Sequence, residues 1–282
     1  MKVFQTIVQI REKVQSFRAQ GRTIGFVPTM GALHQGHLAL VQSSKQNCDI
    51  TIASIFVNPT QFNNPEDLEN YPRTSSSDIE KLEGVSCDFL FMPSKEEMYP
   101  HENSIKIQLG SIANQLEGKF RPGHFDGVGV VVSKLFNIVQ PDQAFFGQKD
   151  LQQFFIIKKL IDEVNFPITL NMVPTVREAN GLAMSSRNLR LNSDQTEDAS
   201  LIYKSLLKAQ KMLLSHTPIL EVKAKIEELF STQRCLELEY FEVINTDNFE
   251  SVNDVVEKEK IAMCIAAEIG RVRLIDNLML IS

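Results

Sequence analysis

The sequence predicts an α/β fold in which a mostly parallel, doubly wound sheet is followed by a smaller α+β domain. Short apolar runs alternate with helix-periodic segments up to Thr175, a pattern typical of parallel strands joined by right-handed helical crossovers. From Ser193 onward, two amphipathic helices precede three strand-like segments. The chain has 282 residues, of which 43% are hydrophobic, and this is enough for a sizeable core.

Five strands and their connecting helices make up the predicted parallel sheet. Continuous apolar runs predict strands at residues 23–27, 50–57, 88–92, 143–146 and 168–173. Helical spacing of apolar residues predicts helices at 7–17, 75–84, 128–139 and 154–161, and another that starts at Leu38. After the sheet we expect helices at 194–215 and 219–231, and strands at 237–244, 260–268 and 271–280. We therefore divide the chain into a Rossmann-like domain, residues 1–176, and a C-terminal domain, residues 177–282.

Charge and cysteine content limit the partners and the compartment. A formal net charge of -6 gives no general attraction to nucleic acid or to an anionic membrane, so recognition of phosphate must be local. The four cysteines form no CxxC pair, the N-terminus lacks the apolar core of a signal peptide, and no apolar run approaches the roughly 18 residues that span a bilayer. We expect a reduced, cytoplasmic setting.

The strongest chemical signal lies where the first of these strands meets the next helix. Pro28 ends the strand, Gly31 and Gly36 permit unusual backbone angles, and His34 and His37 flank the start of the helix. Unpaired N–H groups and the positive end of the helix dipole favour a phosphate there, with room beside Gly36. Both imidazoles can face one side of the first turn and donate to phosphoryl oxygens.

The two histidines have alternative interpretations. An HxxH pair on a helix can also bind a metal ion or lie on an ordinary surface turn. The sequence has no HExxH pattern, and His101, His124 and His216 lie in no ligand-spaced cluster with cysteine, so structural zinc is not expected.

Polar side chains also follow the later strands. Asn58 and Gln61 come after the second strand, at the sheet edge where open α/β sheets bind ligands. After the fourth strand, Lys149 can serve a phosphate and Asp150 a ribose hydroxyl, while Gln153 lies one turn into the next helix and faces the same cleft.

Two polar loops complete the candidate site. Ser185, Ser186 and Arg187 suit a polyphosphate tail, and their place at the domain boundary is one where ligand clefts form. The Gly-rich stretch at residues 117–127 is either a mobile lid or an ordinary long loop.

Six motifs, in this order, resemble the pantothenate synthetase family of the nucleotidylyltransferase superfamily, whose members carry an HxGH element. The resemblance covers nearly the whole chain. The motifs are Pro28-Thr29-Met30-Gly31 with His34-x-Gly36-His37, Phe56-Val57-Asn58-Pro59-x-Gln61-Phe62, Tyr71-Pro72-Arg73-Thr74, Arg121-Pro122-Gly123-His124-Phe125, Phe146-Gly147-Gln148-Lys149-Asp150 and Ser185-Ser186-Arg187-Asn188.

The resemblance implies an AMP-forming ligase of the cytoplasm that condenses (R)-pantoate with β-alanine to give pantothenate. In the family, the pantoate carboxylate attacks the α-phosphorus of ATP, pyrophosphate leaves, and the β-alanine amine then displaces AMP from pantoyl adenylate. The implied small-molecule partners are ATP with Mg²⁺ and the two acids, with no nucleic acid or membrane partner, and a homodimer is implied.

Residue roles follow from the same resemblance. The implied donors to the phosphates are His34, His37, Lys149 and Arg187. The implied ATP pocket comprises Met30, Gly31, Ala32, Leu33, His34, Gln35, Gly36, His37, Gly147, Gln148, Lys149, Asp150, Val176, Met184, Ser185, Ser186 and Arg187. Within it, Asp150 would bind the ribose, and backbone groups of Val176 and Met184 would read adenine. Gln61 and Gln153 would bind pantoate, while Gln61, Asn58 and Tyr71 line the entry of β-alanine.

Two positions depart from the family pattern. Many members have an acid associated with Mg²⁺ immediately before Asp78, where this chain has Ser77, so we assign no metal ligand. In Gly270–Asn277, Val272 replaces the usual threonine. This segment is far from the cleft in sequence, and we expect no effect on the chemistry.

Two rival functions remain from the residues alone. One is a nucleotidylyltransferase of the same superfamily with a different acceptor, and the other is a nucleotide-binding module that has lost the reaction. The amide-rich loop at residues 58–61 and the acidic pI near 5.5 argue against a tRNA-linked acceptor. The presence of His37, Lys149 and Arg187 argues against a module without activity.

Overall fold

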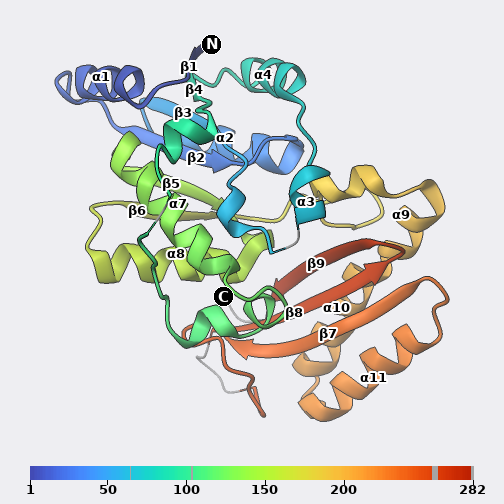
Figure 1. Ribbon diagram of the computed structural model, residues 1–282. Coiled ribbons are helices and arrows are strands. Elements are labelled where there is room, and N and C mark those ends of the chain that lie inside the picture. The colour runs from blue at the N-terminus through green and yellow to red at the C-terminus, as the bar shows by residue number, and fades with distance from the viewer. Residues whose placement is uncertain (64, 103, 256–259, 281–282) are drawn as a thin grey trace. The chain divides into compact units, whose positions relative to one another are not determined.

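The computed structural model describes residues 1–63, 65–102, 104–255 and 260–280 (Figure 1). The chain divides into two compact units, each described by itself. The first consists of Met1–Gly147 and Gln152–Val173, and the second of Gln148–Leu151 and Pro174–Ser282. The short segment Gln148–Leu151 belongs to the second unit, although it directly follows Gly147 at the end of a strand of the parallel sheet.

The first unit is built on a six-stranded parallel sheet with the order β1-β4-β3-β2-β5-β6. Its strands are β1 (Lys2–Phe4), β2 (Ile24–Thr29), β3 (Ile50–Ile55), β4 (Phe89–Phe91), β5 (Gln143–Gly147) and β6 (Thr169–Val173). This order confirms the predicted α/β fold class. The strand order reverses between β2 and β5, and the carboxyl ends beside such a switch point are where open α/β sheets bind ligands.

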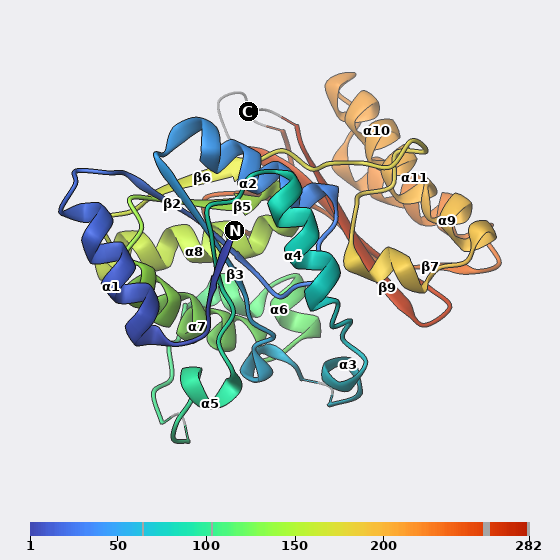
Figure 2. The same cartoon turned by 90° about the horizontal axis from the view of Figure 1, so that it is seen from above.

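Helices cover both faces of this sheet (Figures 1 and 2). Right-handed crossovers put α2 and α4 on one face and α1, α7 and α8 on the other, and α2 packs against β2, β3 and β5. The long helices are α1 (Ile7–Arg18), α2 (Gln35–Asn47), α4 (Ser75–Gly84), α7 (His124–Val139) and α8 (Leu151–Val164). The short ones are η1 (Pro59–Gln61), α3 (Pro65–Glu69), α5 (Lys95–Met98), η2 (Ser111–Asn114) and α6 (Glu117–Phe120).

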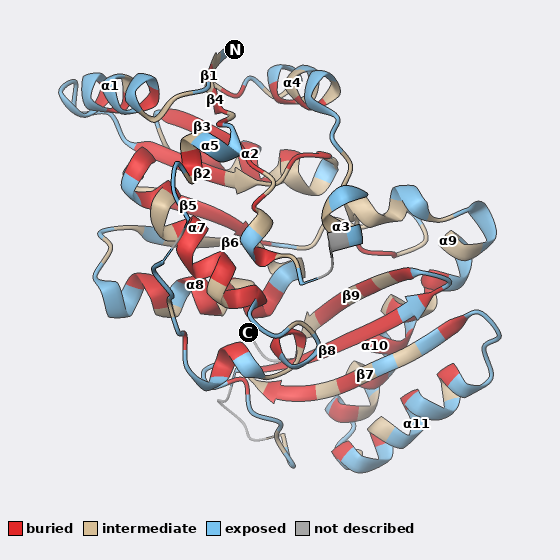
Figure 3. Ribbon diagram, in the orientation of Figure 1, coloured by how far each residue is buried: buried red, intermediate tan, exposed pale blue. Residues whose placement is uncertain are grey.

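Burial explains why the apolar runs form these strands. All six residues of β3 are buried, and β2 is buried from Ile24 to Val27. Because helices cover both faces, a central parallel strand has no side that faces water, and its sequence is mostly apolar. In β3 the exceptions are Thr51 and Ser54. Figure 3 shows this buried layer running through the sheet.

The second unit contains an antiparallel sheet of three strands in the order β7-β8-β9. The strands are β7 (Leu236–Asn245), β8 (Ile261–Ile269) and β9 (Val272–Met279), and the helices are η3 (Gln148–Asp150), η4 (Ser186–Arg190), α9 (Ser193–Ala199), α10 (Leu201–Leu214) and α11 (Ile219–Ser231). Helices α10 and α11 pack on the sheet and on each other. Leu206, Ile226 and Ile265 belong to the apolar core that they share.

The structure differs from the predicted elements at β1, at residues 194–215 and at the start of α7, and the short helices were not predicted. β1 was not predicted, because three residues are too few to give a pattern, and this strand depends on its pairing with β4. The helix expected at 194–215 is two helices, and Ser200 caps the first of them. Helix α7 begins at His124, inside the stretch at residues 117–127, and α6 occupies the start of that stretch. Much of the candidate lid is therefore helical.

Candidate active site

A buried carboxylate holds the turn between β2 and α2. Asp78, on α4, is 1% exposed, and its two oxygens accept from the backbone N–H groups of Ala32, at 2.9 Å, and Leu33, at 2.8 Å. From the next turn of α4, Lys81 donates to the Leu33 carbonyl at 2.7 Å. Gly31 has a φ of +86°, which glycine adopts without strain. Sequence reasoning assigned no such anchoring to Asp78 or Lys81, because 45 or more positions separate them from the turn.

The two histidines cap α2. Nδ1 of His34 accepts from the N–H of Gly36 at 3.1 Å, and Nδ1 of His37 accepts from the N–H of His34 at 3.3 Å. Their ring centroids are 4.1 Å apart, so the rings lie together as expected. In a neutral imidazole whose Nδ1 accepts, the proton is on Nε2, and both Nε2 groups are therefore donors suited to phosphoryl oxygens.

The expectation of unpaired amides and open space at this helix start is wrong in detail. The N–H of Gly36 bonds to the His34 ring, and that of His37 bonds to the His34 carbonyl at 2.9 Å. A Cβ on Gly36 would lie 2.8 Å from Cε1 of His34. The glycine therefore makes room for an imidazole ring, and the rings themselves are the groups that can present donors to a phosphate.

Beyond β3, the predicted substrate residues form a buried network of amides. Nε2 of Gln61 donates to Sδ of Met30 at 2.8 Å, and Nδ2 of Asn58 donates to Oε1 of Gln61 at 3.2 Å. Asn58 Nδ2 also donates to the Gly127 carbonyl, and the Tyr99 hydroxyl donates to Asn58 Oδ1 at 2.9 Å. Asn58 is 1% exposed and Gln61 7%. The orientation of the Gln61 amide is thus fixed by its neighbours.

Tyr99 is a member of this network to which the sequence analysis assigned no role. Burial raises the pKa of the Tyr99 hydroxyl above its ordinary value, so the hydroxyl keeps its proton and can donate to Asn58. The signal in the sequence was only its place after a strand, since nothing local distinguishes a donor tyrosine from a packing one.

The Arg121–His124 motif supports Gln61 through its backbone. Nδ1 of His124 lies 2.7 Å from the Gln61 carbonyl, and Arg121 donates to the same oxygen at 3.4 Å. Helix α7 also approaches this segment closely, because a Cβ on Gly127 would lie 2.3 Å from the Thr60 carbonyl oxygen. The start of α7, which is part of the candidate lid, therefore packs against the loop at residues 58–61.

The remaining predicted residues of the first unit lie near the same sheet edge. The Tyr71 ring packs edge-on against Phe62 with centroids 5.7 Å apart, and Gln153 is half-buried on α8. A cavity of about 370 Å³ is bordered by Met30 and Gly31 together with residues that follow β3 and β4. The predicted ATP residue Gly147 ends β5.

The other predicted ATP residues belong to the second unit. The N–H of Met184 donates to the Val176 carbonyl at 3.0 Å. These two backbone groups therefore bond to each other. Ser185 caps η4 by accepting from the N–H of Arg187 at 3.2 Å. Nζ of Lys149 lies 3.8 Å from Oδ1 of Asp150.

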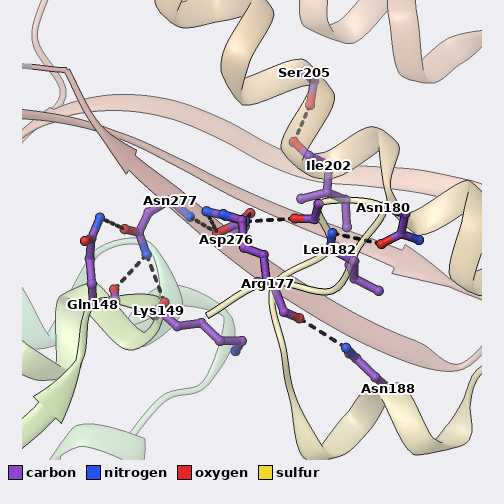
Figure 4. Close-up of polar contacts among 12 residues, drawn as sticks. Gln148, Lys149, Arg177, Asn180, Leu182, Asn188, Ile202, Ser205, Asp276 and Asn277 are labelled. Carbon is purple, nitrogen blue, oxygen red and sulfur yellow. Dashed lines mark hydrogen bonds and ion pairs between the residues drawn. The ribbon is translucent and has the colours of Figure 1, made fainter. Parts of the chain in front are cut away.

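The C-terminal segment, which is far from the predicted cleft in sequence, contacts predicted ATP residues. Asn277 donates to the carbonyls of Gln148 and Lys149, and Asp276 pairs with Arg177 (Figure 4). These contacts were not predicted, because β9 lies more than a hundred positions beyond η3 in the chain. The expectation that Val272 has no effect on the chemistry stays a prediction. Val272 itself lies at the start of β9, paired with Ile269.

The described residues hold neither a cluster of metal-ligating side chains nor a helix that could span a membrane. Among residues 1–63, 65–102, 104–255 and 260–280, no three His, Cys, Asp or Glu side chains gather in a way that could hold a metal ion. Every helix in that part of the chain is too short or too polar to cross a bilayer.

Known proteins resemble this chain along its whole length. The profile of a family described as pantoate-beta-alanine ligase matches residues 2–279. A pantothenate synthetase from Porphyromonas gingivalis is 43% identical over 278 residues, which cover 99% of both chains.

Solved structures agree with this similarity. A pantothenate synthetase from Thermus thermophilus superposes with a TM-score of 0.93 and 35% identity, covering 100% of both chains. A pantoate-beta-alanine ligase from Francisella tularensis, complexed with beta-gamma ATP and beta-alanine, has a TM-score of 0.83 and 38% identity over 99% of this chain and 98% of that one.

Proposed function

Because the chain belongs to the pantoate-β-alanine ligase family, we propose that it condenses (R)-pantoate with β-alanine at the expense of ATP, which leaves as AMP and pyrophosphate. The observation that carries this proposal is the family match across residues 2–279. The histidine-capped turn at the carboxyl end of β2 supports it, because this turn carries the family's HxGH element.

The first step would be attack of the pantoate carboxylate on the α-phosphorus of ATP. Negative charge accumulates as pyrophosphate leaves, and it must be met by donors that are already in position. The Nε2–H groups of His34 and His37 fit this need, since both Nδ1 atoms are engaged by backbone amides. Lys149 and Arg187 would bring positive charge to the phosphates.

Pantoate would be held by neutral amides from Gln61 and Gln153. A cation paired tightly with the carboxylate would stabilise the nucleophile before it attacks and so slow the reaction. A neutral amide orients the carboxylate and stabilises it less. Gln61 is well suited, because Met30 and Asn58 fix its side chain and His124 lies against its carbonyl.

The second step would be displacement of AMP by the amine of β-alanine. Tyr71 and Gln61 would border its path, and Asn58 would act mainly through Gln61, because both ends of its amide are bonded within the protein. The step transfers the acyl group from phosphate to nitrogen and needs no covalent enzyme intermediate.

We propose that the remaining ATP contacts come from the turn at residues 30–37, from Gly147 and Gln148–Asp150, and from Val176 and the loop at residues 184–187. Asp150 would bind the ribose.

Magnesium would be carried mainly by ATP. The carboxylate of Asp78 already accepts from two backbone amides and from the Thr74 hydroxyl, and the preceding residue is Ser77. Because the Asp78 carboxylate is already engaged, phosphate oxygens and water would be the main ligands of the ion, as is common for Mg²⁺ in phosphoryl-transfer sites. Bound in that way, Mg²⁺ would neutralise charge on the leaving pyrophosphate.

The family resemblance also leads us to propose a homodimer in the cytoplasm. The free cysteines Cys48, Cys87, Cys235 and Cys264 fit a reducing compartment. Sedimentation of the purified chain would test the assembly.

Exchange of radiolabelled pyrophosphate into ATP tests the reaction itself. Exchange should require pantoate and proceed without β-alanine, because adenylation precedes amide formation. Exchange without any acid, or with a different acceptor in place of pantoate, would contradict the proposal. Absence of exchange under all conditions would favour a nucleotide-binding module.

A further inference from the structure

Two neighbouring polar side chains on β9 are almost fully buried and have no part in the reaction described so far. Asp276 is 3% exposed and Asn277 is 2% exposed. Adjacent residues of a strand point to opposite faces of the sheet, and these two contact different segments. Asp276 meets Arg177, whereas Asn277 meets the turn that contains Gln148 and Lys149 (Figure 4).

Asn277 fixes the backbone on both sides of Lys149. Its Nδ2 donates to the carbonyls of Gln148 and Lys149, each at 2.9 Å, and its Oδ1 accepts from Nε2 of Gln148 at 3.3 Å. The Gln148 carbonyl belongs to the peptide group before the Lys149 Cα, and the Lys149 carbonyl belongs to the one after it. When one amide group holds both peptide planes, the direction in which the Lys149 side chain leaves the backbone is set.

Asp276 fixes the turn that leads to the serine–arginine loop. Its carboxylate forms a bidentate pair with Arg177, with N–O distances of 2.6 and 3.1 Å. The same guanidinium donates to the Gly181 carbonyl at 3.2 Å and lies over the Tyr203 ring, 3.7 Å from the centroid. Arg177 pairs with Ala183 across this turn.

We propose that Asp276 and Asn277 are positioning residues for adenylate formation: Asn277 aims Lys149 at the phosphates, and Asp276 holds the turn at residues 177–183 from which Met184–Arg187 emerges. The inference rests on the proposed roles of Lys149 and Arg187 and adds what fixes them. Neither β9 residue needs to touch ATP.

The chemistry of the two side chains agrees with these tasks. Only an amide at position 277 can donate to two carbonyls and accept from Gln148 at once. A carboxylate at position 276 matches the planar fork of a guanidinium with two parallel hydrogen bonds. Both side chains are almost fully buried, so the loss of a hydrogen-bond partner is costly.

The test is Asn277→Ala, measured by pyrophosphate–ATP exchange with saturating pantoate. The rate of exchange should fall about 10- to 100-fold, the loss expected when a reacting group is displaced by about 1 Å, with a smaller change in the KM for pantoate. In a Lys149→Ala background, Asn277→Ala should cause little further loss of exchange rate. Asn277 acts by orienting the Lys149 ammonium group, which this background lacks.

The outcomes separate this inference from the proposed function. If Lys149→Ala leaves exchange unchanged, the role assigned to Lys149 is wrong. If Lys149→Ala slows exchange but Asn277→Ala has no effect, or multiplies the loss independently, the positioning role of Asn277 is overturned while the ligase function stands.

A second variant keeps the test decisive if Asn277→Ala unfolds at the assay temperature. Gln148→Ala removes the bond to Asn277 Oδ1 from the side of the turn and leaves β9 intact. It should slow exchange about threefold, as expected for one hydrogen bond, and only when Lys149 is present. No change would overturn the inference. Arg273→Ala, on the same strand but paired with Glu239, is the matched control and should leave exchange unchanged.

Discussion

The hydroxyl of Tyr99 determines which way a buried amide faces. It donates to Asn58 Oδ1, so Asn58 must turn its NH₂ group toward Gln61 and Gly127. Gln61 in turn directs its own NH₂ group at Met30. One tyrosine proton therefore contributes to the orientation of the amide proposed to hold pantoate, although Tyr99 is not itself a predicted substrate contact.

Tyr99→Phe should weaken the use of both acids more than the use of ATP. Loss of one buried hydrogen bond of about 1 kcal/mol corresponds to roughly a fivefold fall, and it should appear in kcat/KM for pantoate and β-alanine, with the KM for ATP unchanged. Steady-state kinetics measures all three. Equal losses for ATP would show a general structural effect, and Tyr240→Phe on β7 is the matched control.

Among the elements, α7 and the loop after β3 are in unusually close contact. Gly127 lies against Thr60, where a Cβ would come within 2.3 Å of the carbonyl oxygen and 2.8 Å of the Gln61 N atom. The obstructing atoms are backbone, which cannot move aside as a flexible side chain can. Glycine is therefore required at position 127 by the close approach of the backbone at residues 60–61.

Gly127→Ala should displace Gln61 and lower kcat/KM for pantoate about 100-fold, the scale of a 1 Å misplacement, with overpacking that destabilises the fold by about 1–3 kcal/mol. Pantoate kinetics and urea unfolding would measure these effects. Gly129→Ala is the control on the same helix, because its Cβ would meet only the side chains of Leu109 and Ile107. If both variants lose pantoate activity equally, the contact with Thr60 is not the cause.

At this scale the sequence was informative where burial is continuous. β3 was predicted because it is a mostly apolar run, and all six of its residues are buried. The same reasoning found β5, whose three central residues are buried. It missed β1, whose three residues gain their stability from pairing with β4. It also joined α9 to α10, because a serine that ends one helix has the same local signature as one on a helix surface.

For the molecule as a whole, the proposed ATP residues are divided between two compact units. His34 and His37 lie in the first unit, while Lys149 and Arg187 lie in the second. Each unit has its own apolar core. The packing of either unit therefore does not depend on a bound nucleotide. The proposal requires that one polyphosphate be contacted by both.

A double-mutant cycle on His37→Ala and Arg187→Ala tests this requirement. Each change should slow pyrophosphate exchange about 100-fold, as the loss of one preorganised donor does, and the combined loss should be smaller than the product because both donors act on the same phosphates. Strictly multiplicative losses would mean that the two side chains act on different groups. His37→Ala combined with Arg273→Ala should show no coupling.

The candidate site was predictable from the sequence as a set of motifs, but its supports were not. The HxGH turn and the predicted Lys149 loop stand beside recognisable strands, so their chemistry could be read from local order. Asp78, Tyr99 and Asn277 act across 41 to 129 positions, and no local pattern encodes a contact that only folding creates. The contacts of Asn277 with Gln148 and Lys149 were not predicted for this same reason.

The place of β9 in the order of synthesis has a consequence for a growing chain. The ribosome completes all six parallel strands before it reaches Asn277, which is made 129 residues after Gln148. A nascent chain halted at Ile269 would therefore contain every proposed phosphate-binding motif. The turn that carries Lys149 would still lack its hydrogen bonds to Asn277. Competence for adenylation would arise abruptly, with the translation of the final strand.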